Sequence, residues 1–78
     1  MTPTDVKAIR AHFGLSRREF AEKIGVSWST VQAIETGRRR ITDETRTKIT
    51  STFDLSADVL DTIHRVKLAE QYYRGGGD

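Results

Sequence analysis

The segment of residues 16–37 places the strongest constraint on the fold of this chain, because it specifies two short helices and the turn between them. Ser16 and Glu19 have the spacing of a capping box, in which each side chain accepts a hydrogen bond from the backbone amide of the other residue. Ser27 is suited to cap the second helix through its hydroxyl oxygen. Gly25 precedes it, where the end of the first helix needs a residue that adopts positive φ without steric cost. The pattern therefore predicts two helices that are joined by a tight turn and cross at a steep angle.

The remainder of the chain also has helical spacing, and no segment alternates apolar and polar residues over the length of a strand. We expect an all-α fold in which five helices form one compact domain. The expected helices span about residues 3–13, 16–24, 27–36, 43–53 and 56–73. The domain is expected to comprise residues 1–74, and the glycine-rich residues 75–78 are expected to form a flexible tail.

The predicted helix over residues 27–36 has two different faces. Val31 and Ile34 are expected to pack inward against the preceding helix, where the small side chain of Ala21 allows a close approach. The outward face then consists of Trp28, Ser29, Gln32, Ala33 and Thr36. That face carries no acidic residue, and a helix this short fits the major groove of DNA.

The charge of the chain is unevenly distributed. Residues 1–40 contain eight Lys or Arg and four Asp or Glu, a balance of +4, whereas residues 41–78 contain five and seven, a balance of −2. A basic half favours a surface that faces a polyanion, although an ordinary solvated surface is the alternative. The run Arg38–Arg40 has the same two interpretations, since it is either a row of phosphate contacts or a solvated loop.

Several classes of protein and site are disfavoured by what the sequence lacks. Without cysteine the chain can form neither a disulfide nor a thiolate metal site, which favours a reducing, cytoplasmic location. No apolar run is long enough to span a bilayer, and the N-terminus has no signal-peptide pattern. His12 and His64 have no accompanying ligand pattern, and no catalytic constellation or phosphate-binding loop is present. We therefore expect no metal, no cofactor, no membrane association and no enzymatic activity.

The sequence also contains a characteristic series of residues: Leu15-Ser16-Arg17-Arg18-Glu19-Phe20-Ala21-Glu22-Lys23-Ile24-Gly25-Val26-Ser27, then Thr30-Val31, then Ile34-Glu35-Thr36-Gly37-Arg38. This series resembles the phage repressor and Cro-like helix-turn-helix family, also called the xenobiotic-response-element family, and the resemblance extends over residues 5–62. It implies a lambda-repressor-like fold and sequence-specific binding to double-stranded DNA. The family usually has Gln where this chain has Arg17, and that Gln helps to hold a DNA phosphate. A guanidinium can bind the same phosphate with a full charge.

The resemblance also implies three groups of functional residues. The base-contacting residues would be Trp28, Ser29, Gln32 and Ala33. The phosphate-contacting residues would be Arg17, Arg18, Thr36, Arg38, Arg39 and Arg40. The third group is a structural pair between Arg10 and Glu35, for which the alternative is an exposed Glu35. For Trp28 the alternative is a partly exposed side chain that covers the preceding helix.

Specific DNA binding by a module this small normally requires two copies on a two-fold operator. We therefore expect a homodimer, and the helix over residues 56–73 is its candidate interface. The residues assigned to that interface are Val66, Leu68, Tyr72 and Tyr73. The alternative is that this helix folds back on its own domain.

These observations together predict a transcriptional regulator, a repressor that binds an inverted-repeat operator in the cytoplasm of a bacterium or a phage-infected host. One alternative is an antitoxin-like autorepressor whose last helix also binds a protein partner, such as a toxin or an antirepressor. Another alternative is a protein-interaction module that has lost DNA binding. Arg17 and the run Arg38–Arg40 argue against this last interpretation.

Overall fold

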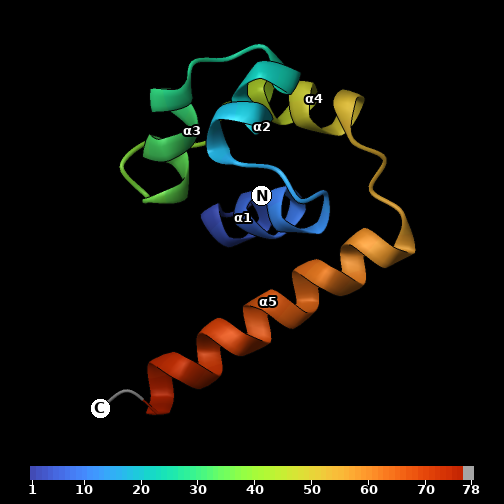
Figure 1. Cartoon of the computed structure of the whole chain (residues 1–78). Coiled ribbons are helices and arrows are strands. Elements are labelled where there is room, and N and C mark those ends of the chain that lie inside the picture. Colours follow the sequence, from blue (N-terminus) through green and yellow to red (C-terminus); the bar gives the residue numbers. More distant parts are fainter. Residues whose placement is uncertain (77–78) are drawn as a thin grey trace.

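The computed structural model describes the backbone of residues 1–76 and the side chains of residues 1–72, and within that range it contains five helices and no strand. They are α1 (Pro3–His12), α2 (Arg17–Ile24), α3 (Trp28–Glu35), α4 (Asp43–Thr52) and α5 (Ala57–Gly76) (Figure 1). The expected all-α fold with five helices is confirmed. α5 continues to Gly76, beyond the predicted end near residue 73 and into the stretch that we expected to be a tail. Gly77 and Asp78 lie outside the described residues.

Side-chain caps set the start of four of the helices. Thr2, Ser16, Ser27 and Thr42 cap α1, α2, α3 and α4, and each accepts a hydrogen bond of 3.1–3.2 Å from the backbone amide three residues later. In α2 the capping box is complete, because Glu19 Oε1 accepts from the Ser16 amide at 2.9 Å. This hydrogen bond from the Ser16 amide is the main reason that the pKa of Glu19 lies below its ordinary value. Local chemistry therefore decides where these helices begin.

The turn between α2 and α3 depends on a glycine in the left-handed conformation. Gly25 has φ 75° and ψ 36°, and its amide donates to the Ala21 carbonyl oxygen at 2.9 Å. The next amide, that of Val26, donates to the same carbonyl at 3.0 Å. These bonds end α2 and direct the chain at once into the cap of α3. A residue with a Cβ would be strained at position 25 in this conformation.

The apolar core receives residues from all five helices. Its buried members are Val6, Ile9, Phe20, Ala21, Ile24, Val31, Ile34, Ile49, Phe53 and Val59. Phe20 of α2 stacks parallel to Phe53, which follows α4, with ring centroids 5.2 Å apart. Because α3 contributes Val31 and Ile34 to this core, its opposite face is turned outward.

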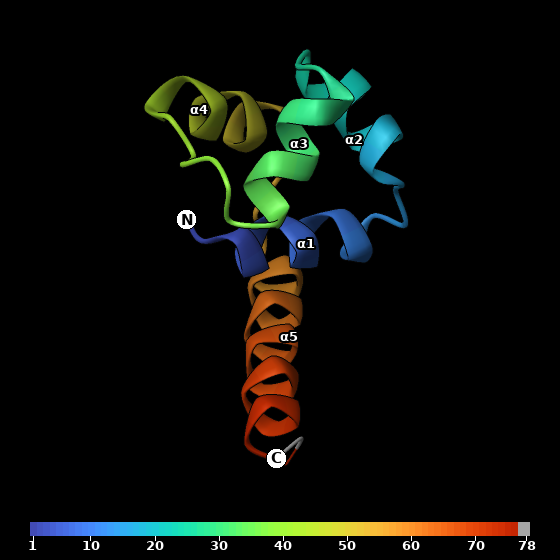
Figure 2. The same cartoon turned by 90° about the vertical axis from the view of Figure 1, so that its left-hand side faces the viewer.

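α1 lies between two parts of the molecule. Figures 1 and 2 show α2, α3 and α4 on one side of α1 and α5 on the other. Three hydrogen-bonded contacts join α1 to α5: Asp5 Oδ1 with Lys67 Nζ at 2.8 Å, Thr4 Oγ1 with Glu70 Oε2 at 2.6 Å, and His12 Nδ1 with Thr62 Oγ1 at 2.9 Å. Residues nearer the N-terminus of α1 contact residues nearer the C-terminus of α5, so the two helices run antiparallel. α5 therefore packs on its own domain at least as far as Glu70.

Candidate nucleic-acid interface

α3 presents an uncharged face at the surface of the molecule. Figure 2 shows α3 toward the viewer, between α2 and α4. Trp28 and Ser29 are exposed, and Gln32 and Ala33 are half-buried. The four residues that the sequence predicts as base contacts therefore all lie on this helix with part of their surface accessible, opposite the residues that pack into the core.

Trp28 is the largest side chain of this face and the first residue of α3. It is 42% exposed, so a little over half of its surface is covered by the protein. This exposure leaves enough of the indole accessible for contact with DNA. It also agrees with the alternative, in which the partly exposed indole covers the preceding helix.

Hydroxyl groups at the two ends of α3 form hydrogen bonds within the helix. Ser29 Oγ lies 3.1 Å from Ser27 Oγ, the cap of the helix. Thr36 Oγ1 donates to the Gln32 carbonyl oxygen at 2.9 Å. An ionised phosphate only accepts hydrogen bonds. To bind a phosphate, Thr36 must therefore turn its single hydroxyl proton away from the Gln32 carbonyl oxygen.

Glu35, the last residue of α3, joins three helices through a fully buried carboxylate. Arg10 of α1 donates to both of its oxygens, from Nε to Oε2 at 2.8 Å and from Nη2 to Oε1 at 3.1 Å. Arg17 of α2 donates from Nε to the same Oε1, also at 3.1 Å. The structure thus contains the pair of Arg10 and Glu35 that we expected. It adds Arg17, for which the sequence indicated only a phosphate contact, because no local spacing relates residues 17 and 35.

The other arginines predicted as phosphate contacts are exposed. Arg18 lies in the first turn of α2, and Arg38–Arg40 form the loop after α3. This loop follows Gly37, which has φ 78°, and the amides of its first two arginines donate to the Ala33 carbonyl oxygen at 2.9 and 3.2 Å. Among the described residues none of these four arginines forms an ion pair. Their charges are therefore available beside α3.

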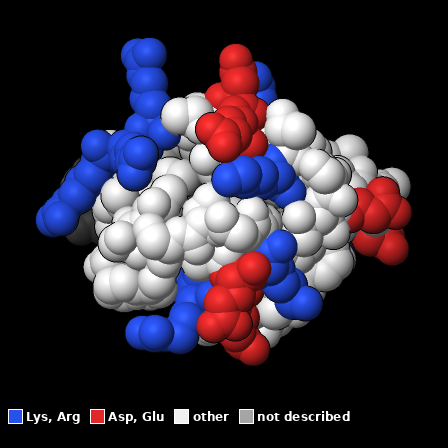
Figure 3. Space-filling model, turned by 90° about the horizontal axis from the view of Figure 1, so that it is seen from above, with Lys and Arg blue, Asp and Glu red and all other residues white. Residues whose placement is uncertain are grey.

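Positive charge gathers on the side of the molecule that carries α3. Figure 3 shows the molecule from above, with basic side chains on its left-hand side, where Figure 1 places α3, and acidic side chains farther from that side. A polyanion approaching α3 therefore meets a favourable field before it makes any contact. An uncharged helix face beside clustered positive charge is typical of a protein that binds nucleic acid.

The tight turn at Gly25, the outward face of α3 and the basic loop define a helix-turn-helix DNA-binding protein. A family model described as helix-turn-helix matches residues 6–60, more than half of the chain. The chain belongs to the Cro/C1-type, lambda-repressor-like helix-turn-helix family, and it is a DNA-binding transcriptional regulator. The resemblance found in the sequence is thereby confirmed. Comparisons with curated proteins and with solved structures gave no match.

The residues predicted for a dimer interface lie in different environments. Val66 is half-buried and lines a groove between α1, α5 and the end of α3, so it faces its own domain. Leu68 is 51% exposed and Tyr72 is 80% exposed, whereas the side chain of Tyr73 lies outside the described residues. Leu60 is also exposed, but it lines a groove together with Asp5 and Ile9 of α1.

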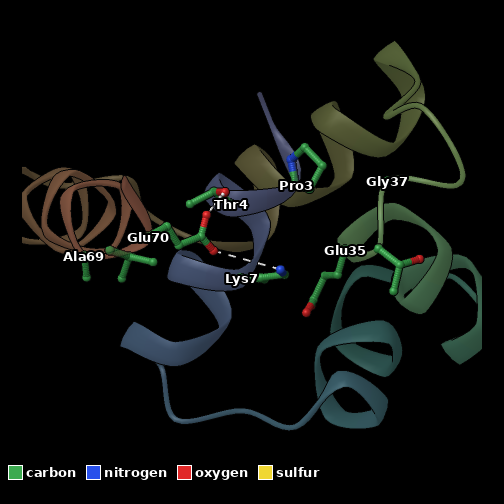
Figure 4. A pocket seen from close by; sticks show the side chains of 9 residues that line it. Pro3, Thr4, Lys7, Glu35, Gly37, Ala69 and Glu70 are labelled. Atoms are coloured by element: carbon green, nitrogen blue, oxygen red, sulfur yellow. Dashed lines mark hydrogen bonds and ion pairs between the residues drawn. The ribbon is translucent and has the colours of Figure 1, made fainter. Parts of the chain in front are cut away.

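The groove beside Val66 has a polar bridge across it. Glu70 of α5 accepts a hydrogen bond from Thr4 and lies 3.9 Å from Lys7 Nζ, as the dashed lines in Figure 4 show. The groove has a volume of about 650 Å³ and extends to Glu35 and Thr36 at the end of α3. Residues of α5 therefore line the same groove as the C-terminal end of α3, the helix that carries the predicted base contacts.

Within residues 1–72 no group of three or more His, Cys, Asp or Glu side chains is arranged to hold a metal ion. None of the described helices combines the length and the apolar character that crossing a membrane requires.

Proposed function

We propose that this protein is a repressor that binds an inverted-repeat operator as a homodimer, in the cytoplasm of a bacterium or a phage-infected host. The observation that carries the proposal is the exposed face of α3, which has no acidic side chain and lies beside the basic loop Arg38–Arg40. A helix of this kind is suited to enter a major groove while the arginines neutralise the flanking phosphates. Occupation of an operator that overlaps a promoter is sufficient for repression.

Trp28, Ser29, Gln32 and Ala33 are the proposed base contacts. The side-chain amide of Gln32 can pair with N7 and N6 of adenine, and the methyl group of Ala33 can contact the methyl group of thymine. Trp28 offers a broad apolar surface and one N–H donor, which suit a thymine methyl group or a sugar. Only Gln32 is suited to a bidentate contact, so we infer that DNA shape supplies part of the specificity.

The proposed phosphate contacts are Arg17, Arg18, Thr36, Arg38, Arg39 and Arg40. Their positions support this role in two ways. Arg17 and Arg18 lie in the first turn of α2, where the unpaired amides and the helix dipole also attract an anion. The loop arginines are exposed and their backbone is anchored to α3, so they can bind phosphates next to the bases that α3 contacts.

The exposed apolar residues of α5 support the homodimer. Leu68 and Tyr72, four residues apart, lie on one side of the helix, and exposed apolar groups at helical spacing are commonly covered by association. To bind an inverted repeat, such a contact must place the two α3 helices on the same side of a DNA duplex. The same exposed residues favour a second candidate, an antitoxin-like autorepressor whose α5 also binds a toxin or an antirepressor.

Selection of bound DNA from a random duplex pool, with the full chain at moderate salt, tests the proposed function. The expected product is an inverted repeat whose half-site centres lie about 10–10.5 base pairs apart. Failure to enrich any sequence would refute sequence-specific binding. Light scattering of the complex with the selected duplex is then expected to give two chains for each duplex. One chain for each duplex would contradict the homodimer and leave α5 for a different protein partner.

A further inference from the structure

The buried carboxylate of Glu35 carries two guanidinium groups that differ in what remains free on each. Arg10 uses Nε and Nη2 for Glu35 and donates from Nη1 to the Leu15 carbonyl oxygen at 3.0 Å. Arg17 uses only Nε within the described residues. A guanidinium has five N–H donors, so the four donors on the two terminal nitrogens of Arg17 keep no protein acceptor there.

The charges of this cluster do not balance. Two guanidinium groups face one carboxylate, which leaves one positive charge uncompensated. Arg10 is 23% exposed and its donors are largely occupied, whereas Arg17 is 34% exposed with both terminal nitrogens available. The surplus charge is therefore presented to solvent at Arg17. Two terminal nitrogens in a planar fork match an anion with two oxygen acceptors, such as a phosphodiester.

We propose that Glu35 is a positioning residue for DNA binding, because its bond to Nε holds the Arg17 guanidinium with both terminal nitrogens directed at a backbone phosphate. This inference rests on the proposed function of DNA binding. A guanidinium already held in one orientation loses less conformational freedom when it binds, which favours the complex. Since Glu35 ends α3 and Arg17 begins α2, the same bond sets the phosphate contact relative to the helix that contacts the bases.

The variant Glu35→Gln tests this role, because positioning and long-range electrostatics predict opposite changes in DNA affinity. The substitution removes a negative charge close to the proposed DNA surface, and long-range electrostatics alone would make binding tighter. Loss of positioning instead predicts a dissociation constant for the selected duplex that is roughly 3- to 10-fold higher, the range expected when one flexible side chain must be ordered on binding. Circular dichroism must show that the variant is folded at the temperature of the titration. Binding that is as tight as in the wild type, or tighter, would overturn the proposal.

A double-mutant cycle separates positioning from a purely structural role of Glu35. Arg17→Met removes the guanidinium that Glu35 is proposed to hold. In that background Glu35→Gln is expected to cause no further loss of DNA affinity, because there is no longer a side chain to position. An equal loss in both backgrounds would mean that Glu35 acts only through the stability of the fold, and it would overturn the proposal.

Arg17→Lys provides a second route if Glu35→Gln does not fold. A lysine keeps the charge, but its single ammonium cannot act as a rigid fork between Glu35 and a phosphate. Arg65→Lys is the matched control, since Arg65 also forms an ion pair through Nε, with Asp61 at 3.0 Å, but lies on α5 outside the proposed DNA contacts. We expect Arg17→Lys to weaken binding by roughly 3- to 10-fold and Arg65→Lys by less than about twofold. Equal effects of the two substitutions would contradict a special role of Arg17.

The outcomes distinguish this inference from the proposed function on which it rests. If the wild-type chain enriches no duplex, both are refuted. If the wild type binds its selected site and the substitutions at residues 17 and 35 leave the dissociation constant unchanged, only the positioning role of Glu35 is refuted.

Discussion

Arg10 Nε and Nη2 donate to the two oxygens of Glu35 at 2.8 and 3.1 Å, and this forked ion pair ties α1 to the last residue of α3. The carboxylate is fully buried, so it depends on its partners to offset the loss of hydration. The pair therefore supports the orientation of α3, and with it the face that is proposed to contact DNA.

Arg10→Met is expected to destabilise the fold, because it leaves the buried carboxylate of Glu35 with Arg17 as its only ionic partner. We expect the free energy of unfolding to fall by about 2–3 kcal/mol, below the usual cost of breaking a buried pair since Arg17 remains. Urea denaturation followed by circular dichroism measures this change. The control is Arg65→Met, which breaks an exposed pair with Asp61 and should cost less than about 1 kcal/mol. Equal losses in the two variants would contradict the importance assigned to the buried pair.

Asp5 makes the contact between α1 and α5 sensitive to acid. Burial acts to raise the pKa of its carboxyl, but hydrogen bonds from Lys67 and from the Thr2 amide together outweigh burial and lower the pKa below the ordinary value of 3.8. Because the pKa is lowered in the folded state, the stabilisation is present above pH 3.8 and is lost as the pH falls through the lowered value.

Asp5→Asn is therefore expected to lower the stability at neutral pH and to flatten its decline in acid. Thermal unfolding at several values between about pH 5 and pH 2 measures the difference. Asp54→Asn is the control, because Asp54 is exposed and forms no ion pair within the described residues, and it should retain the pH dependence of the wild type. Parallel curves for Asp5→Asn and the wild type would show that the Lys67 contact does not contribute.

The loop Arg38–Arg40 is expected to control the salt dependence of DNA binding. Each arginine that neutralises a phosphate contributes about 0.9 to the slope of log affinity against log salt. Replacing all three arginines with Ala should therefore reduce the slope by up to about 2.7 when the selected duplex is titrated over a range of salt concentrations. An unchanged slope would show that the loop is a solvated segment without phosphate contacts.

Trp28→Ala separates the two interpretations of the exposed indole. If Trp28 contacts DNA, the dissociation constant should rise by about tenfold, the lower part of the range for loss of a specific base contact, while the stability changes by roughly 1 kcal/mol or less. Equilibrium unfolding and titration of the selected duplex measure the two quantities on the same preparation. A large loss of stability with unchanged affinity of the folded protein would show that Trp28 is instead a cover for α2.

Leu68→Glu tests the proposed homodimer through α5. Leu68 is half-exposed in the single chain, so a charge there should not disturb the fold but should repel a second copy across a two-fold contact. Sedimentation or light scattering is expected to show a shift from dimer to monomer. Ala69→Glu is a neighbouring control in which the charge faces the groove between α1 and α5 rather than the exposed apolar side. A dimer that persists in Leu68→Glu would place the interface elsewhere.

The features that the sequence predicted correctly depend on residues that are close together in the chain. Ser16 and Ser27 each cap a helix by binding an amide only three residues away, and Gly25 ends α2 through its own backbone conformation. Such interactions form whenever the helix forms, so residue type and spacing are sufficient to identify them. The inward position of Val31 and Ile34 followed from helical periodicity for the same reason.

The features that only the tertiary structure decided join residues that are far apart in the chain. Arg17 meets Glu35 across 18 positions, and Thr4 meets Glu70 across 66. Whether such side chains meet depends on the angles at which α1, α2, α3 and α5 pack, and these follow from the fit of the whole core rather than from any local pattern. The sequence by itself determined the helices, the turn and the uncharged face of α3. The tertiary structure decided that Arg17 shares a buried carboxylate with Arg10, and that Val66 faces its own domain while Leu68 stays exposed.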